Sequence, residues 1–192
     1  MNQTPILKLP KDLLTLVEII QKGGIIAYPT EAVFGLGCSP QNYPAVEKLL
    51  SLKHRQPDKG LILIGSNFNQ FKEYILPIPL DNLEKVLSSW PGPYTWVFPT
   101  PQTTSKWLRG NHSSIAIRVT AHPIAKAICQ QLNTPLVSTS ANKEGEPPAL
   151  SVKDIFDIFG NQLDAIVDGQ LGGLLKPTEI KNAENLQIIR PS

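Results

Sequence analysis

The chain has 192 residues, of which 41% are hydrophobic and 18% charged, and its formal net charge is +2 at pH 7. This length and composition fit a single globular domain over residues 1–192 and exclude a disordered or fibrous chain. The mild positive charge permits an anionic ligand without demanding a nucleic-acid partner, and no apolar run approaches the roughly 20 residues of a membrane span, so a cytoplasmic protein is expected.

The first elements are a helix and a strand. An apolar stripe at helical spacing predicts a helix over residues 13–20, ended by the glycines at 23–24. Residues 25–28 then read as a short buried strand. Further along the chain, the pattern predicts helix 44–52, strand 61–64, helices 71–76 and 83–90, strands 94–98 and 114–119, helix 124–131, strand 136–137, helix 152–159, and strands 165–167 and 186–189.

Strands and helices alternate in this pattern, but several strands lack a helix long enough for a regular crossover. The predicted fold class is therefore α/β, with a single twisted mixed β-sheet flanked by helices.

Cys38 and Cys129 lie in apolar contexts without metal-ligand spacing, and buried, reduced thiols are expected.

The segment 28–37, Tyr-Pro-Thr-Glu-Ala-Val-Phe-Gly-Leu-Gly, is the first motif. Gly35 and Gly37 predict a tight turn behind the strand, so that Thr30 and Glu31 lie in a loop at the strand's end, where α/β sheets bind ligands. A purely structural turn is the alternative. Glu31 is the only carboxylate in the motif, and both a turn-stabilising and a metal-facing role are open for it.

Two cations, Lys53 and Arg55, follow the expected helix 44–52. They are two residues apart and cannot share one helical stripe, so Arg55 is expected to leave the helix. Such a pair can bracket a polyphosphate, because arginine clamps two oxygens and lysine acts as a compact charge. The alternative is a solvated helix end, where positive side chains favour the helix dipole.

The third motif, Ser138-Thr-Ser-Ala-Asn142, directly follows the strand 136–137. A turn accounts for one Ser and one Asn, and not for four polar side chains. All three motifs fall at strand or helix ends, which is typical of one site assembled from loops on a rigid frame. Together they predict one concave, basic site.

Lys53-x-Arg55 followed far downstream by Ser140-x-Asn142 resembles the signature of the YrdC-like family of threonylcarbamoyl-AMP synthases, in its short bacterial form. The resemblance implies a YrdC-like fold with a motif-bearing core over about residues 12–180. Other segments that match the family in order are 90–93, 116–118 and 122–123.

The resemblance implies a nucleotidyltransferase that joins L-threonine, bicarbonate and ATP into threonylcarbamoyl-AMP and releases pyrophosphate, for the threonylcarbamoyladenosine modification of tRNA. It implies a substrate-bound Mg²⁺ with no confident metal ligand from the protein, a transient downstream tRNA threonylcarbamoyl transferase as partner, and an open question of direct tRNA contact. The implied site residues are Lys53 and Arg55 as catalytic residues at the phosphates, Ser140 and Asn142 with them at the nucleotide, and Thr30, Arg118 and Ser138 at threonine.

The longer synthases of the family carry Thr, Asn, His and Ser where this chain has Ala32, Lys59, Ile64 and Pro148, whereas the short bacterial form resembles this chain at the first three. The threonine pocket could therefore differ in detail from that of the longer enzymes. Two other functions are kept open: a non-catalytic RNA-binding module, which would show steep salt dependence, and a carbamoyl-adenylate-handling domain of the kind found in larger hydrogenase-maturation proteins.

Overall fold

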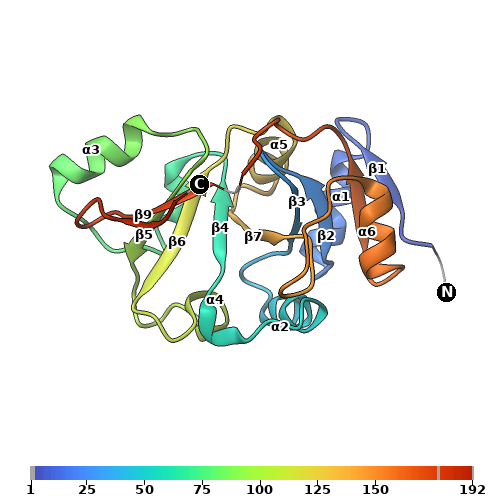
Figure 1. Cartoon of the computed structure of the whole chain (residues 1–192), viewed down its shortest axis with the longest axis horizontal. Coiled ribbons are helices and arrows are strands. Elements are labelled where there is room, and N and C mark those ends of the chain that lie inside the picture. The colour runs from blue at the N-terminus through green and yellow to red at the C-terminus, as the bar shows by residue number, and fades with distance from the viewer. Residues whose placement is uncertain (1–2, 177, 192) are drawn as a thin grey trace.

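The computed structural model describes residues 3–176 and 178–191. Within these residues, ten strands form one mixed sheet with helices on both faces (Figure 1). This single α/β domain confirms the predicted fold class. No helix in the described ranges is both long and apolar enough to cross a membrane.

The strands follow the order β1-β8-β2-β3-β7-β4-β6-β5-β9-β10 across the sheet. The pairs β1/β8, β8/β2, β4/β6 and β5/β9 are parallel, and the other neighbouring pairs are antiparallel. The strands are β1 (Ile6–Lys8), β2 (Ile26–Pro29), β3 (Phe34–Gly37), β4 (Ile62–Gly65), β5 (Tyr94–Pro99), β6 (Ser114–Val119), β7 (Leu136–Ser140), β8 (Ala165–Asp168), β9 (Glu179–Asn182) and β10 (Ile188–Arg190).

The helix boundaries follow local sequence signals. The α5 helix starts at Pro123, whose fixed φ suits a first turn, and ends before Asn133, which has a φ of 54°. Ser151 and Asp154 form a capping box at the start of α6. The helices are α1 (Leu13–Gln21), α2 (Tyr43–Leu52), α3 (Leu80–Ser88), α4 (Lys106–Arg109), α5 (Pro123–Leu132) and α6 (Val152–Phe159), with short 3₁₀ turns η1 (Pro57–Lys59) and η2 (Phe68–Phe71).

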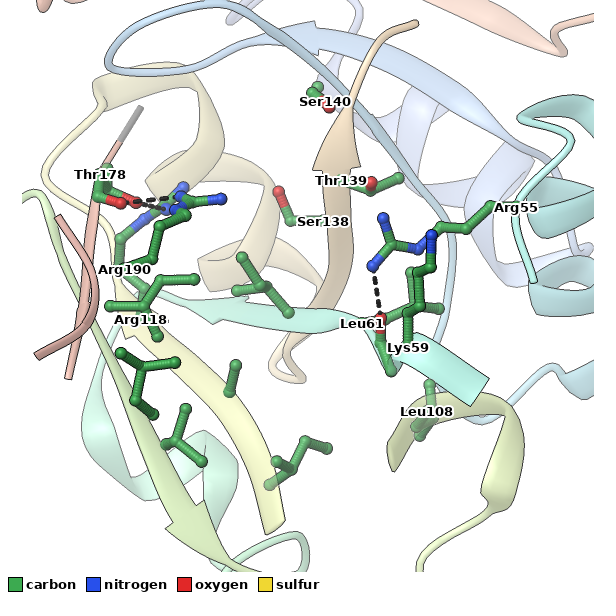
Figure 2. Close-up of a pocket in the computed structure, with 18 of the residues that line it drawn as sticks. Arg55, Lys59, Leu61, Leu108, Arg118, Ser138, Thr139, Ser140, Thr178 and Arg190 are labelled. Atoms are coloured by element: carbon green, nitrogen blue, oxygen red, sulfur yellow. Dashed lines mark hydrogen bonds between the residues drawn. The ribbon is translucent and has the colours of Figure 1, made fainter. Parts of the chain in front are cut away.

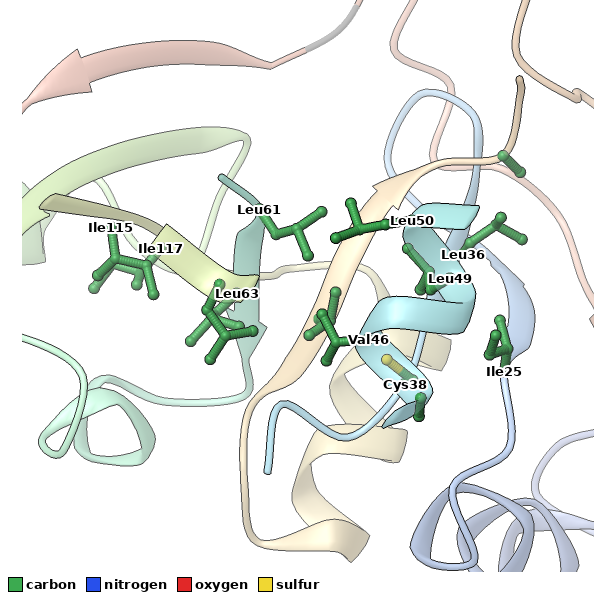
Figure 3. Packing of buried hydrophobic residues seen from close by; sticks show 14 of the residues in the cluster. Ile25, Leu36, Cys38, Val46, Leu49, Leu50, Leu61, Leu63, Ile115 and Ile117 are labelled. Carbon is green, nitrogen blue, oxygen red and sulfur yellow. The ribbon is translucent and has the colours of Figure 1, made fainter. Parts of the chain in front are cut away.

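Buried side chains form one cluster on each face of the sheet. Helices α2 and α6 contribute to the larger cluster, and Figure 3 shows Val46 and Leu49 of α2 packed close to the strands. Helices α1 and α5 cover the other face through residues such as Leu16 and Ile128. Successive strand residues alternate between the clusters, so Ala27 enters the first and Tyr28 the second. Both free cysteines are buried, as predicted.

Two local predictions are wrong. Gly35 and Gly37 do not form a turn, because they lie inside β3, which pairs antiparallel with β2. Residues 71–76 are not a helix either. Lys72 N and Tyr74 N form turn hydrogen bonds to Asn69 O and Phe71 O, and Leu76 N donates to Pro99 O at the end of β5 at 2.8 Å.

Candidate active site

A cavity of about 550 Å³ lies over β4, β5 and β6. Its floor is formed by Ile62, Val97 and Ala116, which alternate with residues of the larger core cluster and therefore point to the other face. Among its described lining residues there are five Lys or Arg side chains and no Asp or Glu, which makes the cavity strongly attractive to anions. These cations are Arg55, Lys59, Arg109, Arg118 and Arg190.

One end of the cavity is built around Arg118, which is buried on β6. Its Nη2 lies 3.4 Å from Glu31 Oε2, and its Nη1 donates to Thr178 Oγ1 at 3.1 Å. Its Nε is buried and has no hydrogen-bond partner among the described residues. Figure 2 shows Arg190 beside it, anchored through Nη2 to Thr178 O at 2.8 Å. Burial and the nearby Arg118 lower the pKa of Arg190.

Glu31 is the buried counter-charge of this end. Its Oε1 accepts a hydrogen bond from Thr120 Oγ1 at 2.6 Å. Burial alone would raise the pKa of the Glu31 carboxyl, but Arg118 and Thr120 outweigh it and the pKa lies below its usual range. Glu31 is therefore ionised and fixes the Arg118 guanidinium. In the described residues no group of three potential metal ligands gathers here or elsewhere.

The other end is built around Arg55, which follows α2. Its Nη2 donates to Gly60 O at 3.0 Å, whereas its buried Nε has no partner in the described ranges. Lys59 forms an ion pair with Glu144 at this end. Figure 2 places Arg55 and Lys59 across the cavity from Arg118 and Arg190.

Lys53 lies behind this end and not in the cavity wall. It is only 2% exposed, and its Nζ donates to Ser140 O at 2.5 Å, to Asn142 O at 2.7 Å and to Asn142 Oδ1 at 3.1 Å. Burial, and then the nearby charge of Arg55, lowers the pKa of Lys53 to about 8. The lysine thus ties the end of α2 to the loop that follows β7.

Hydroxyl-bearing residues of the first and third motifs also line the cavity. Ser138 and Thr139 of β7 line the cavity between the cations in Figure 2. Thr30 also lines it and donates to Val33 O at 2.6 Å. Ser140 Oγ lines the cavity and donates to Asn142 Oδ1 at 2.6 Å.

The structure brings the predicted site residues into one region. Five of them line the cavity, and the other two, Lys53 and Asn142, support the loop beside it. The five in the wall are Thr30, Arg55, Arg118, Ser138 and Ser140. Sequence reasoning missed Arg109 and Arg190, which reach the cavity from a short helix and an edge strand that were not predicted with these bounds.

Arg190 had one weak signal, because it follows the strand expected at 186–189 and could have been placed at a strand end. Arg109 had none, because nothing in the local pattern indicates that α4 packs beside η1.

A cavity with cations at both ends and an apolar floor can hold an elongated ligand that has two separated anionic groups.

Comparisons with known proteins identify the family of this chain. The Sua5_yciO_yrdC family model, described as "Telomere recombination", matches residues 18–192. A threonylcarbamoyl-AMP synthase from Coxiella burnetii (strain RSA 493 / Nine Mile phase I) is 49% identical over 174 residues, covering 91% of this chain and 94% of the relative.

Two solved structures of P. abyssi Sua5 are also similar to this chain. A double variant superposes with a TM-score of 0.91 at 26% identity, covering 98% of this chain and 60% of Sua5. The complex of Sua5 with L-threonine gives a TM-score of 0.86 at 25% identity, covering 94% of this chain and 54% of Sua5. This chain therefore matches little more than half the length of Sua5.

Proposed function

Because this chain belongs to the Sua5/YciO/YrdC family and is a threonylcarbamoyl-AMP synthase of tRNA modification, we propose that its cavity binds ATP and L-threonine at opposite ends. The reaction first joins the threonine amine to bicarbonate as a carbamate, with loss of water. A carbamate oxygen then attacks the α-phosphate of ATP, and pyrophosphate leaves. The proposal depends above all on one observation, the placement of cations at both ends of a cavity whose lining has no described carboxylate.

Adenylyl transfer of this kind needs orientation and charge neutralisation more than covalent help from the protein. Arg55 binds the phosphates in this proposal, because its side chain lines the cavity at this end. Lys59 lies next to it and can exchange its bond to Glu144 for a phosphate oxygen.

The threonine carboxylate binds at the Arg118 end. A carboxylate accepts from two donors at once, and Arg118 lines the cavity with a guanidinium that Glu31 and Thr178 hold in place. Ser138 and Thr30 line the wall next to it and face the amine and side chain of the substrate. The complex of P. abyssi Sua5 with L-threonine supports this choice of ligand.

Lys53 and the Ser140–Asn142 segment serve the nucleotide. Ser140 borders the cavity, whereas Lys53 fixes the backbone of Ser140 and Asn142 through three hydrogen bonds. Its ammonium charge also adds to the positive potential at the phosphate end. Substitution of Lys53 is therefore expected to act largely through this loop.

A Mg²⁺ ion that accompanies ATP fits the site as a substrate-bound ion. The described lining residues offer hydroxyls and no carboxylate, so the phosphate oxygens and water would supply most of its ligands. Such an ion neutralises charge on the leaving pyrophosphate.

The adenylate would then pass to a tRNA threonylcarbamoyl transferase. Salt-dependent binding of tRNA to the purified chain tests direct contact.

Pyrophosphate release tests the proposal. The purified chain is supplied with ATP, Mg²⁺, threonine and bicarbonate, and each component is omitted in turn. Release should require all of them. Arg55→Ala should lower the rate by about 10²-fold or more, on the order of one strong transition-state contact, whereas Lys48→Ala, outside the cavity, should not. A folded Arg55→Ala variant with normal release would refute the assignment.

A further inference from the structure

The buried side chain of Tyr28 reaches a residue of the cavity wall from two strands away. Its hydroxyl donates a hydrogen bond to Ser138 Oγ at 2.8 Å, although the two residues are 110 positions apart in sequence. Tyr28 lies on β2 and Ser138 on β7, and β3 lies between these strands in the sheet. The ring must therefore pass over β3 to make this contact.

Gly35 and Gly37 of β3 provide the space for the ring. A Cβ atom at Gly37 would lie 2.9 Å from Tyr28 Cε1, and one at Gly35 would lie 3.4 Å from Tyr28 Cζ. Neither glycine has a positive φ, so the backbone conformation does not require glycine at these positions. At Gly37 the close approach of the Tyr28 ring and of Val137 O, 2.6 Å from such a Cβ, requires glycine, whereas at Gly35 the ring is at ordinary contact distance and the nearest atom is Thr30 Cγ2 at 3.2 Å.

The hydrogen bond has a defined direction. The Tyr28 hydroxyl donates to Ser138 Oγ, and burial raises the pKa of this hydroxyl far above its usual value, so it keeps the proton that it donates. A serine hydroxyl has one proton to donate and two positions that accept. With one accepting position occupied by Tyr28, and no other hydrogen-bond partner of Ser138 Oγ among the described residues, its own proton is free to point into the cavity.

We propose that Tyr28 is a positioning residue that fixes the Ser138 hydroxyl as a hydrogen-bond donor to the threonine substrate, and that the glycines of β3 leave the space in which the Tyr28 ring lies. This inference rests on the proposed function, in which Ser138 lies at the threonine end. A hydroxyl held this way favours an accepting group such as a carboxylate. Without Tyr28 the hydroxyl rotates freely and loses part of that preference.

The test is Tyr28→Phe, which keeps the ring and removes only the hydroxyl. Tyr74→Phe is the matched control, because Tyr74 is another buried tyrosine and does not line the cavity. Tyr28→Phe should raise the KM for threonine roughly fivefold to tenfold, the range of one hydrogen bond. The KM for ATP should stay near the wild-type value, and Tyr74→Phe should change neither.

Ser138→Ala completes a double-mutant cycle. It should raise the KM for threonine, and adding Tyr28→Phe to it should cost nothing further, because the tyrosine acts only through Ser138. Equal effects of Tyr28→Phe with and without Ser138 would overturn the inference. So would a normal threonine KM in Tyr28→Phe, or melting far below the Tyr74→Phe control. If Ser138→Ala itself leaves the threonine KM unchanged, the proposed role of Ser138 fails and the inference fails with it.

Discussion

Removing the carboxylate of Glu31 should destabilise the fold as well as the site. Glu31→Gln keeps the shape and the hydrogen bond from Thr120 but leaves the Arg118 cation without its counter-charge. The two side chains are 9% and 7% exposed, so water screens the pair weakly. At 3.4 Å between Nη2 and Oε2, an effective dielectric of about 20 gives an attraction of about 5 kcal/mol. Loss of one partner of a buried pair typically costs about 3 to 5 kcal/mol.

We therefore expect Glu31→Gln to lower the free energy of unfolding in urea by about 3 kcal/mol. Arg118→Met should cost a similar amount, and the double variant should be more stable than the sum of the two losses predicts. Asp157→Asn, which breaks the exposed pair with Lys153, is the control and should have no measurable effect. Small, additive losses in Glu31→Gln and Arg118→Met would refute the argument that this pair is a buried, coupled unit.

The same pair sets part of the pH dependence. The pKa of Glu31 is lower in the folded protein than the usual value of about 4.3. Its stabilising contribution is therefore complete above that value and is lost as the pH falls through the lower, folded pKa. Unfolding measured from pH 7 to pH 3 should show a smaller acid-dependent loss in Glu31→Gln than in the wild-type chain.

Three further predictions concern the surroundings of the cavity. The pKa of Lys53 is about 8 in the folded protein, below its unfolded value of about 10.4. The wild-type chain should therefore gain stability relative to Lys53→Met as the pH rises from 8 to 10. Urea unfolding measures this, and a stability difference between the two chains that does not change with pH would contradict it. Gly37→Ala should cost about 2 kcal/mol in unfolding experiments, because its Cβ would lie 2.6 Å from Val137 O; an unchanged melting curve would show that the strands adapt. Glu144→Gln should lower the KM for ATP in the pyrophosphate assay by freeing Lys59, and a higher KM would show that the ion pair helps ATP to bind.

The amphipathic helices could be predicted from sequence because their signals are local. The apolar stripe of α1 and the proline at the start of α2 do not depend on distant residues. The glycines of β3 could not be interpreted locally, because the atoms that crowd Gly37 are Val137 O and the ring of Tyr28, which belong to other strands. Strands β1 and β9 were missed since each is short and pairs with a strand distant in sequence.

In the site, too, some features could be predicted from local sequence and others depend on residues distant in the chain. The three motifs converge as predicted, because β3 pairs with β7 and β7 with β4 in the middle of the sheet, and the Arg55 side chain reaches the same cavity. Sequence could not show that the ammonium of Lys53 is held by the backbone of Ser140 and Asn142, since that depends on where α2 ends relative to β7. Arg109 and Arg190 add charge to the cavity from segments without a motif.

The most direct test of the two-ended cavity compares substrate affinities in Arg55→Ala and Arg118→Ala. Pyrophosphate release is followed while ATP and threonine are varied separately. The predicted result is a crossed pattern, in which Arg55→Ala raises mainly the KM for ATP and Arg118→Ala raises mainly the KM for threonine. If both folded variants raise the same KM, or neither changes either value, the two substrates do not occupy opposite ends of this cavity.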